Sequence, residues 1–265
     1  MNNFFAFLIS FCFLLFKVEA QINVSIIDIG SNILIGGFSN GEWLESEQSK
    51  RKIKGDEEYK LYSFDGFLGT TKGDIAESMG APCPNIYFVS TPYKNTKENL
   101  FITGITCNWD AFPKKLALLS TNQKTYIDIT ANLLKSKGIN NPNVEITKII
   151  KTDLENDGID EVFINATYFK NGFTPETSVG DYSFVYLRKI INGKVENIII
   201  DGNYFPESLN SGIPLQFQLC NILDINNDGI LEFIIYSEYY EGIEFCIYRL
   251  IDNKVVLVLS AFCGA

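Results

Sequence analysis

An internal repeat with an offset of 71 residues, from Asp153 to Asp224, most constrains how this chain can fold. Eight of the sixteen residues from 153 to 168 are identical to their counterparts from 224 to 239. Both copies contain Asn-Asp-Gly-Ile, and a glutamate follows two residues after the isoleucine. This degree of identity at one offset indicates a duplicated structural unit.

Each copy of the repeat predicts four β-strands. A strand-length apolar run lies before the acidic stretch, and another lies directly after it. Third and fourth runs are joined by a tight turn, at Asn192-Gly193 in the first copy and at Asp252-Asn253 in the second. Asn-Gly between apolar runs is a strong hairpin signal. We therefore expect a mainly β fold with two four-stranded antiparallel units that resemble propeller blades.

Oxygen-bearing side chains recur at alternate positions in both acidic stretches, at loop positions 1, 3, 5 and 9. Alternate spacing turns successive side chains toward one centre, and the glycine after the third of them permits a tight turn. The backbone carbonyl of residue 7 adds a fifth oxygen, and such a set suits Ca²⁺ better than Mg²⁺. The alternative is a pair of Asx-rich turns that cap hairpins without metal.

These loops differ from EF-hands, because Ile164 and Ile235 stand where position 12 needs a carboxylate and strands flank both loops. The pattern strand, Asp-x-[Asp/Asn/Glu]-x-Asp-Gly-x-x-[Asp/Glu], strand resembles the FG-GAP and VCBS-type repeats, the calcium-loop blades of integrin alpha chains and many secreted bacterial proteins. The resemblance covers about residues 144–262, and two units are too few to close a propeller. It implies two Ca²⁺ sites, one formed by Asp153, Glu155, Asp157, Ile159 and Glu161, the other by Asp224, Asn226, Asp228, Ile230 and Glu232.

One helix is expected, at about 121–137. Ser120 and Gln123 have the spacing of a capping box, apolar residues then recur at helical spacing, and Gly138 stands where a C-terminal glycine cap belongs. The helix divides the chain into parts. We expect a signal peptide at 1–20, a β-rich N-terminal region at 21–115, a connecting helix region at 116–142 and a two-unit repeat region at 143–265.

The N-terminus predicts secretion. The apolar run from Phe4 to Phe16 reaches only about 20 Å as a helix, short of the roughly 30 Å of a bilayer core, but it suits the hydrophobic part of a signal peptide. Val18 and Ala20 fit the −3 and −1 positions of a cleavage site. The main alternative is that the same run stays uncleaved as a signal anchor. No later apolar run is long enough to span a membrane.

Composition narrows the chemistry. The chain has no histidine, which excludes Ser/His/Asp and Cys/His catalysis and histidine-ligated metals. Its net charge of −10 disfavours nucleic acids and anionic membranes and favours hard cations. We therefore favour binding over catalysis, with an extracellular protein or a glycan as the expected kind of partner.

In a secreted protein, cysteines can form disulfides and asparagine sequons can be glycosylated. Removal of residues 1–20 leaves an odd number of cysteines, which indicates two disulfides and one thiol, or one intermolecular link. A bridge from Cys83 to Cys107 is the simplest pairing, and buried free thiols are the alternative. Asn23 and Asn165 stand in sequons for N-glycosylation. The cysteines are Cys83, Cys107, Cys220, Cys246 and Cys263.

Two functions remain in view. The favoured one is a secreted calcium-binding β-repeat protein that acts as an interaction or adhesion module, with Ca²⁺ in a structural role. The alternative is a secreted hydrolase or carbohydrate-binding protein acting on glycans, because Glu238 and Glu241 lie among tyrosines. A glycosidase requires two carboxyl groups about 5 to 9.5 Å apart in a cleft.

Overall fold

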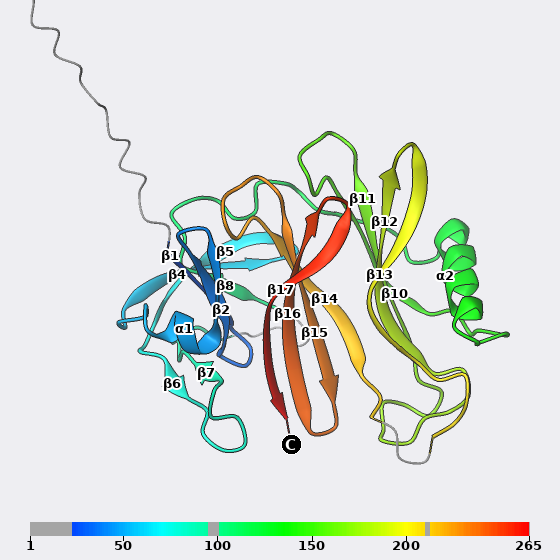
Figure 1. Ribbon diagram of the computed structural model, residues 1–265, viewed down its shortest axis with the longest axis horizontal. Helices are drawn as coiled ribbons and strands as arrows, with labels where there is room; N and C mark the ends of the chain where they lie inside the picture. The colour runs from blue at the N-terminus through cyan, green and yellow to red at the C-terminus, as the bar shows by residue number, and fades with distance from the viewer. Residues whose placement is uncertain (1–22, 95–100, 210–212, 265) are drawn as a thin grey trace, which may run out of the picture.

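The computed structural model describes residues 23–94, 101–209 and 213–264. These residues form three antiparallel sheets and two helices, which confirms the mainly β fold (Figure 1). The predicted signal peptide at 1–20 lies outside the described residues. Neither of the two helices has the length and apolar character that a membrane crossing demands.

The N-terminal sheet has eight strands in the order β5-β4-β8-β1-β2-β7-β6, with β3 paired to β2. The short helix α1 (Ser46–Lys50), which was not expected from the sequence, directly follows β3. Its first turn is closed by the backbone N–H of Glu45, which donates to Gln48 Oε1 at 3.1 Å. The strands are β1 (Asn23–Asp28), β2 (Ile33–Ser39), β3 (Glu42–Glu45), β4 (Glu57–Ser63), β5 (Gly66–Gly73), β6 (Glu77–Ser78), β7 (Tyr87–Phe88) and β8 (Thr103–Ile105).

The two repeat units form the other two sheets, each a four-stranded antiparallel meander as predicted. In the first-unit sheet, of order β13-β12-β11-β10-β9, the short strand β9 (Ala117–Leu118) extends the meander to five strands. The second-unit sheet has the order β14-β15-β16-β17. The strands are β10 (Ile146–Thr152), β11 (Glu161–Tyr168), β12 (Tyr182–Ile191), β13 (Lys194–Tyr204), β14 (Gln216–Leu223), β15 (Glu232–Tyr239), β16 (Gly242–Ile251) and β17 (Lys254–Gly264).

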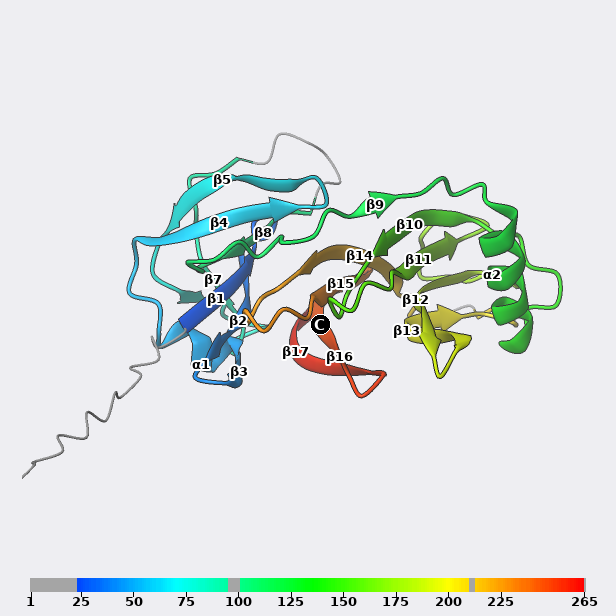
Figure 2. The same cartoon turned by 90° about the horizontal axis from the view of Figure 1, so that it is seen from above.

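The second-unit sheet lies between the other two sheets, and both of its faces are covered (Figure 2). Ile234 packs toward the N-terminal sheet, whereas Phe233 meets Phe163 of the first-unit sheet with ring centroids 5.0 Å apart. Successive strand residues point to opposite faces, so a doubly covered sheet needs apolar residues at consecutive positions. The three sheets therefore stack as layers, and the described strands form neither a propeller nor a closed barrel.

Helix α2 (Lys124–Ser136) covers the outer face of the first-unit sheet, where Thr130 Oγ1 and Tyr186 OH share a hydrogen bond of 2.9 Å (Figure 2). It begins three residues later than predicted, because Ser120 caps nothing in the helix: its Oγ accepts from the N–H of Asn122 instead. The predicted glycine cap is confirmed. Gly138 has φ of 91° and donates to Lys135 O at 3.0 Å.

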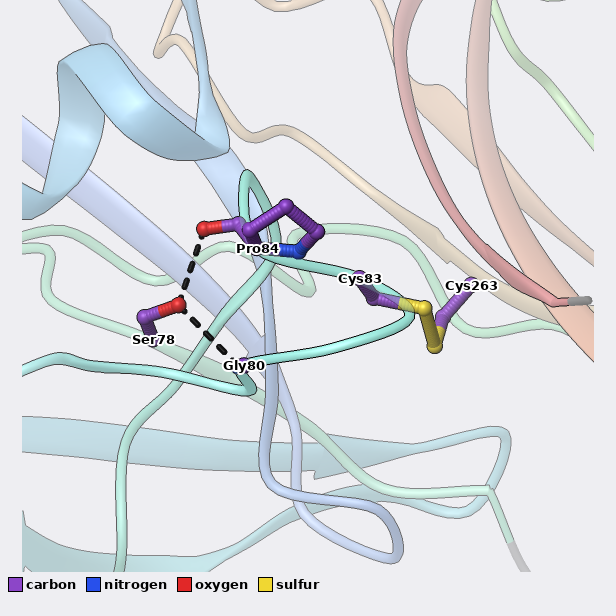
Figure 3. Close-up of a disulfide and its surroundings, with 5 residues drawn as sticks. All are labelled: Ser78, Gly80, Cys83, Pro84 and Cys263. Carbon is purple, nitrogen blue, oxygen red and sulfur yellow. Dashed lines mark hydrogen bonds between the residues drawn. A yellow bond between two sulfur atoms is a disulfide. The ribbon is translucent and has the colours of Figure 1, made fainter.

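A disulfide between Cys83 and Cys263 joins the N-terminal region to the end of β17 (Figure 3). Its Cα atoms are 5.5 Å apart, and 180 residues separate the two cysteines in the sequence. The expected Cys83–Cys107 pairing is therefore wrong, because the stacking of β17 against the N-terminal sheet brings Cys263, and not Cys107, to Cys83. Among the described cysteines Cys107, Cys220 and Cys246 are free, so the expected second bridge is not formed there.

Candidate functional site

The two acidic loops, loop 1 (153–161) and loop 2 (224–232), have the same backbone conformation. Asn156 and Asn227 have positive φ angles of 59° and 62°, and the glycines that follow have φ of 85° and 83°. Such angles are easy for glycine and tolerated by asparagine, which explains the shared Asn-Asp-Gly sequence. The predicted tight turn is confirmed in both copies.

The first aspartate of each loop holds the turn by accepting backbone N–H groups. Asp153 accepts from Asp157 at 3.1 Å and from Gly158 at 3.1 Å. Asp224 accepts from Asp228 at 3.2 Å and from Gly229 at 3.1 Å in the same way. A carboxylate that accepts two backbone donors orders a loop that would otherwise expose them.

The last glutamate of each loop is fully buried and ties the loop back to its own second residue. Glu161 Oε2 accepts from the N–H of Leu154 at 3.0 Å, and Glu232 Oε2 accepts from the N–H of Ile225 at 2.9 Å. The loops also touch each other, because the N–H of Leu231 donates to Leu154 O at 2.9 Å. The two units therefore meet at their acidic loops.

A buried lysine lies among the carboxylates of loop 1. The Nζ of Lys189, on β12, contacts Glu155 Oε2 and lies 3.1 Å from Glu161 Oε1. Its side chain is only 4% exposed. Since the N–H of Leu154 donates to the other oxygen, each oxygen of Glu161 has a hydrogen-bond partner. At the outer end of the loop, Lys114 Nζ donates to Asp153 Oδ2 at 3.0 Å.

An arginine occupies the corresponding place in loop 2. The Nη2 of Arg249, on β16, donates to Asp228 Oδ2 at 2.6 Å, and its Nε lies 3.7 Å from Glu232 Oε1. Neither that Nε nor Glu232 Oε1 has a hydrogen-bond partner among the described residues. Loop 2 is therefore less completely satisfied than loop 1.

The pKa values of the two buried glutamates reflect how closely a cation approaches each of them. Burial raises the pKa of Glu161, and the hydrogen bonds from Leu154 and Lys189 oppose that rise. Burial raises the pKa of Glu232 to about 8, because the more distant Arg249 offsets less of the desolvation. At the exposed end of loop 1, burial alone would raise the pKa of Asp153, but the hydrogen bonds from Lys114 and two backbone donors, with the charge of Lys114, together outweigh it and lower the pKa.

Lys189 and Arg249 are structural equivalents. Arg188 pairs with Val162 across β12 and β11, and Tyr248 pairs with Phe233 across β16 and β15. Val162 and Phe233 are counterparts in the repeat, so their strand partners Arg188 and Tyr248 are counterparts as well. Lys189 directly follows Arg188, and Arg249 directly follows Tyr248. Each unit thus carries one cationic side chain at the same point beside its loop.

Basic side chains lie against the predicted calcium ligands of both loops. The structure brings the side chains of each predicted set into one loop, but it places an ammonium or guanidinium group against the carboxylates at positions 3, 5 or 9. Within the described ranges, no group of three or more acidic or cysteine side chains is arranged to hold a metal ion. As arranged here, the two donor sets do not fit a divalent cation, and calcium binding stays a prediction.

The sequons have different surroundings. Asn165 is buried, its Nδ2 donates to Phe184 O at 3.3 Å and Phe217 O at 3.0 Å, and its Oδ1 accepts from Leu219 N at 3.0 Å. This packing leaves no room for a glycan on that nitrogen, because the amide bridges the two unit sheets. Asn23 is exposed, and its Oδ1 accepts from Ser39 Oγ at 2.6 Å.

The tyrosine and glutamate cluster does not line a described cavity. Tyr236 OH donates to Glu238 Oε2 at 2.8 Å, and Glu241 lies exposed in the turn between β15 and β16. Neither glutamate borders the two cavities that the structure places between the units. The glycan-directed alternative stays a prediction.

A groove between the two units was not foreseen from the sequence. Its first cavity, of about 570 Å³, lies between the edge strand β13 and the β16–β17 hairpin. Its second, of about 550 Å³, is bordered by Glu155, Ile230, Arg249 and Asp252, and Asn253 borders both. We call the two cavities together the inter-unit groove. It starts beside the acidic loops and follows β13. The sequence could not predict it, because the apolar pattern of a single strand does not show where two sheets meet.

Comparison with known proteins adds no further assignment: no family model, no curated protein and no solved structure matches this chain.

Proposed function

We propose that this protein is an extracellular binding module that accepts an extended segment of a partner polypeptide along strand β13. The observation that carries the proposal is an unpaired strand edge beside the inter-unit groove. The extracellular location rests on the predicted signal peptide. Addition of a peptide strand to a sheet edge is a common recognition mode, in which main-chain hydrogen bonds supply affinity and alternate side chains supply specificity.

Strand β13 offers a long edge. It spans Lys194–Tyr204, ends the first-unit sheet, and pairs with β12 alone among the described strands. An edge strand presents unpaired backbone N–H and C=O groups, and natural proteins usually cover such an edge or keep it short. An edge of this length next to a groove is therefore suited to pairing with another chain.

The face beside this edge is incompletely covered. Leu257 on β17 pairs with Tyr248, which packs toward the first-unit sheet, yet Leu257 is 49% exposed. Val255 borders the groove opposite Ile198 and Ile200 of β13. A strand added about 4.8 Å beyond β13 would extend the first-unit sheet over this part of β17 and bury its apolar side chains.

Charge favours a basic partner over a second copy of the chain. The net charge of −10 makes two copies repel each other, whereas Lys or Arg residues in a partner would be attracted. Glu196 and Asp252 border the groove together with Lys254, whereas Glu155 and Arg249 there are already paired with Lys189 and Asp228. The expected ligand is an extended segment with alternating apolar residues and at least one basic residue.

A displayed library of random twelve-residue peptides, selected on the full protein, tests the proposal. We expect selected peptides to lack proline, to alternate apolar residues and to carry Lys or Arg. Their affinity, measured by fluorescence anisotropy, should fall at least tenfold with Leu257→Lys and should be unchanged with Leu118→Lys. Leu118 is also an exposed leucine, but it lies on β9, at the edge of the first-unit sheet opposite β13.

A second arm separates strand pairing from simple apolar adhesion. N-methylation of alternate backbone nitrogens in a selected peptide removes donors without removing side chains, so one of the two methylation registers should abolish binding. Equal binding to the Leu257→Lys and Leu118→Lys variants, or indifference to both methylation registers, would refute the proposal.

A further inference from the structure

The two acidic loops share a backbone conformation but differ in how their carboxylates are neutralised. We infer that Lys189 is a resident cation that takes the place of a metal ion in loop 1, so that this loop folds without a divalent cation. The inference is independent of the proposed peptide binding, because Lys189 does not border the inter-unit groove.

The contacts of Lys189 carry the first step. One ammonium group contacts Glu155 and Glu161, the predicted ligands at positions 3 and 9 of loop 1. Both glutamates would have to turn toward the same centre to bind Ca²⁺, which needs six to eight oxygen ligands at 2.3 to 2.6 Å. A divalent ion placed there would meet a buried positive charge at contact distance, and the repulsion would oppose binding.

Satisfaction of the buried carboxylate carries the second step. Glu161 is fully buried, and its two oxygens accept from the N–H of Leu154 and from Lys189. A buried carboxylate whose oxygens both have donors makes no further demand for a cation. In loop 2 the equivalent Glu232 keeps one oxygen without a hydrogen-bond partner. The buried carboxylate of loop 1 is therefore fully hydrogen-bonded, whereas that of loop 2 is not.

The anchoring of Lys189 carries the third step. It lies near the end of β12, paired with Glu196 of β13 and directly after Arg188, the last residue paired with β11, and its side chain is 4% exposed. A side chain fixed in this way cannot swing out to make room for an ion at little cost. Lys114, at the exposed end of the loop, neutralises Asp153 and also holds Asn156 Oδ1 at 2.6 Å.

Melting of the full chain in calcium and in EDTA tests the inference. We expect any difference between the two melting temperatures of the unchanged protein to persist in Asp157→Asn, which removes one negative charge of loop 1 but keeps an oxygen for the N–H of Ile159. Asp228→Asn is the matched change in loop 2, where Asp228 accepts from Ile230 in the same way. A calcium effect that Asp157→Asn removes would overturn the inference, whereas an effect removed by Asp228→Asn alone, or no effect at all, supports it.

Removal of the resident cation gives the complementary arm. Lys189→Met should create a calcium requirement: in 10 mM Ca²⁺ its melting temperature should rise by about 5 °C over that in EDTA, and adding Asp157→Asn should abolish the rise. A folded Lys189→Met protein that melts equally in calcium and in EDTA would contradict the inference. If the variant does not fold in either buffer, the Asp157→Asn and Asp228→Asn comparison decides the question.

Discussion

Removal of the Cys83–Cys263 disulfide should lower the free energy of unfolding by about 3 to 5 kcal/mol. The bridge closes a loop of 180 residues. In the chain-entropy account such a loop takes about 18 cal/mol/K from the unfolded chain, which is about 5 kcal/mol at 25 °C, and relaxation of the native state reduces the measured loss. Native domains have total stabilities of about 5 to 15 kcal/mol, so this change is a large fraction of the whole.

The bridge also lies where its loss is easy to observe. It ties β17, the last strand of the second-unit sheet, to the N-terminal region, and Trp43 and Trp109 pack in the hydrophobic cluster between those two sheets. Urea unfolding of the double variant Cys83→Ala, Cys263→Ala, followed by tryptophan fluorescence, therefore reports directly on that interface. The midpoint should fall by roughly 1 to 2 M, because urea slopes increase with protein size and are about 3 kcal/mol/M at the upper end of the usual range.

The control is Cys107→Ala, which removes a free, half-buried thiol in the same cluster. It should change the free energy of unfolding by less than about 1 kcal/mol, as expected for a small change at a partly buried site. A loss below about 1 kcal/mol in the double cysteine variant, or one no larger than in the control, would refute the argument from loop length.

Two further predictions concern buried polar groups. Asn165→Ala should cost about 2 to 4 kcal/mol, measured by the same urea unfolding, because it leaves Phe184 O, Phe217 O and Leu219 N without the amide that joins the two unit sheets. Lys148 is half-buried, its Nζ donates to Leu219 O at 3.0 Å, and loss of solvent around the ammonium group lowers its pKa. Since the unfolded chain then holds the proton more tightly, stability should rise as pH increases from the lowered folded pKa toward 10.5, and Lys148→Met should lack that rise; a Lys148→Met protein with the same pH slope as the unchanged one would contradict this.

Local patterns predicted the repeat units well. The two meanders, the tight turns at Gly158 and Gly229 and the glycine cap at Gly138 all follow from short-range chemistry, and the structure has each of them. The start of helix α2 was predicted three residues early, because Ser120 uses its hydroxyl on Asn122 rather than on the first helical turn. Local signals of this kind depend on a few neighbouring residues, which the sequence displays directly.

Contacts between distant segments could not be predicted in the same way. The Cys83–Cys263 pairing, the burial of Asn165 and the inter-unit groove all result from how the sheets stack. The doubly covered second-unit sheet did leave a trace, since Phe233-Ile234-Ile235 is apolar at consecutive positions. That run indicates burial on both faces, but it does not say which sheets provide the cover.

The basic residue of each loop was hidden from the repeat comparison by an insertion. The connection between the second and third strands has 13 residues in the first unit (169–181) and two in the second (240–241). The third strands are therefore offset by 60 residues rather than 71, so Lys189 and Arg249 do not align when the acidic loops do. Only the strand register makes them counterparts. The similar acidic patterns thus predicted two equivalent metal sites, whereas the cations that contact the carboxylates come from strands that have diverged in both spacing and chemistry.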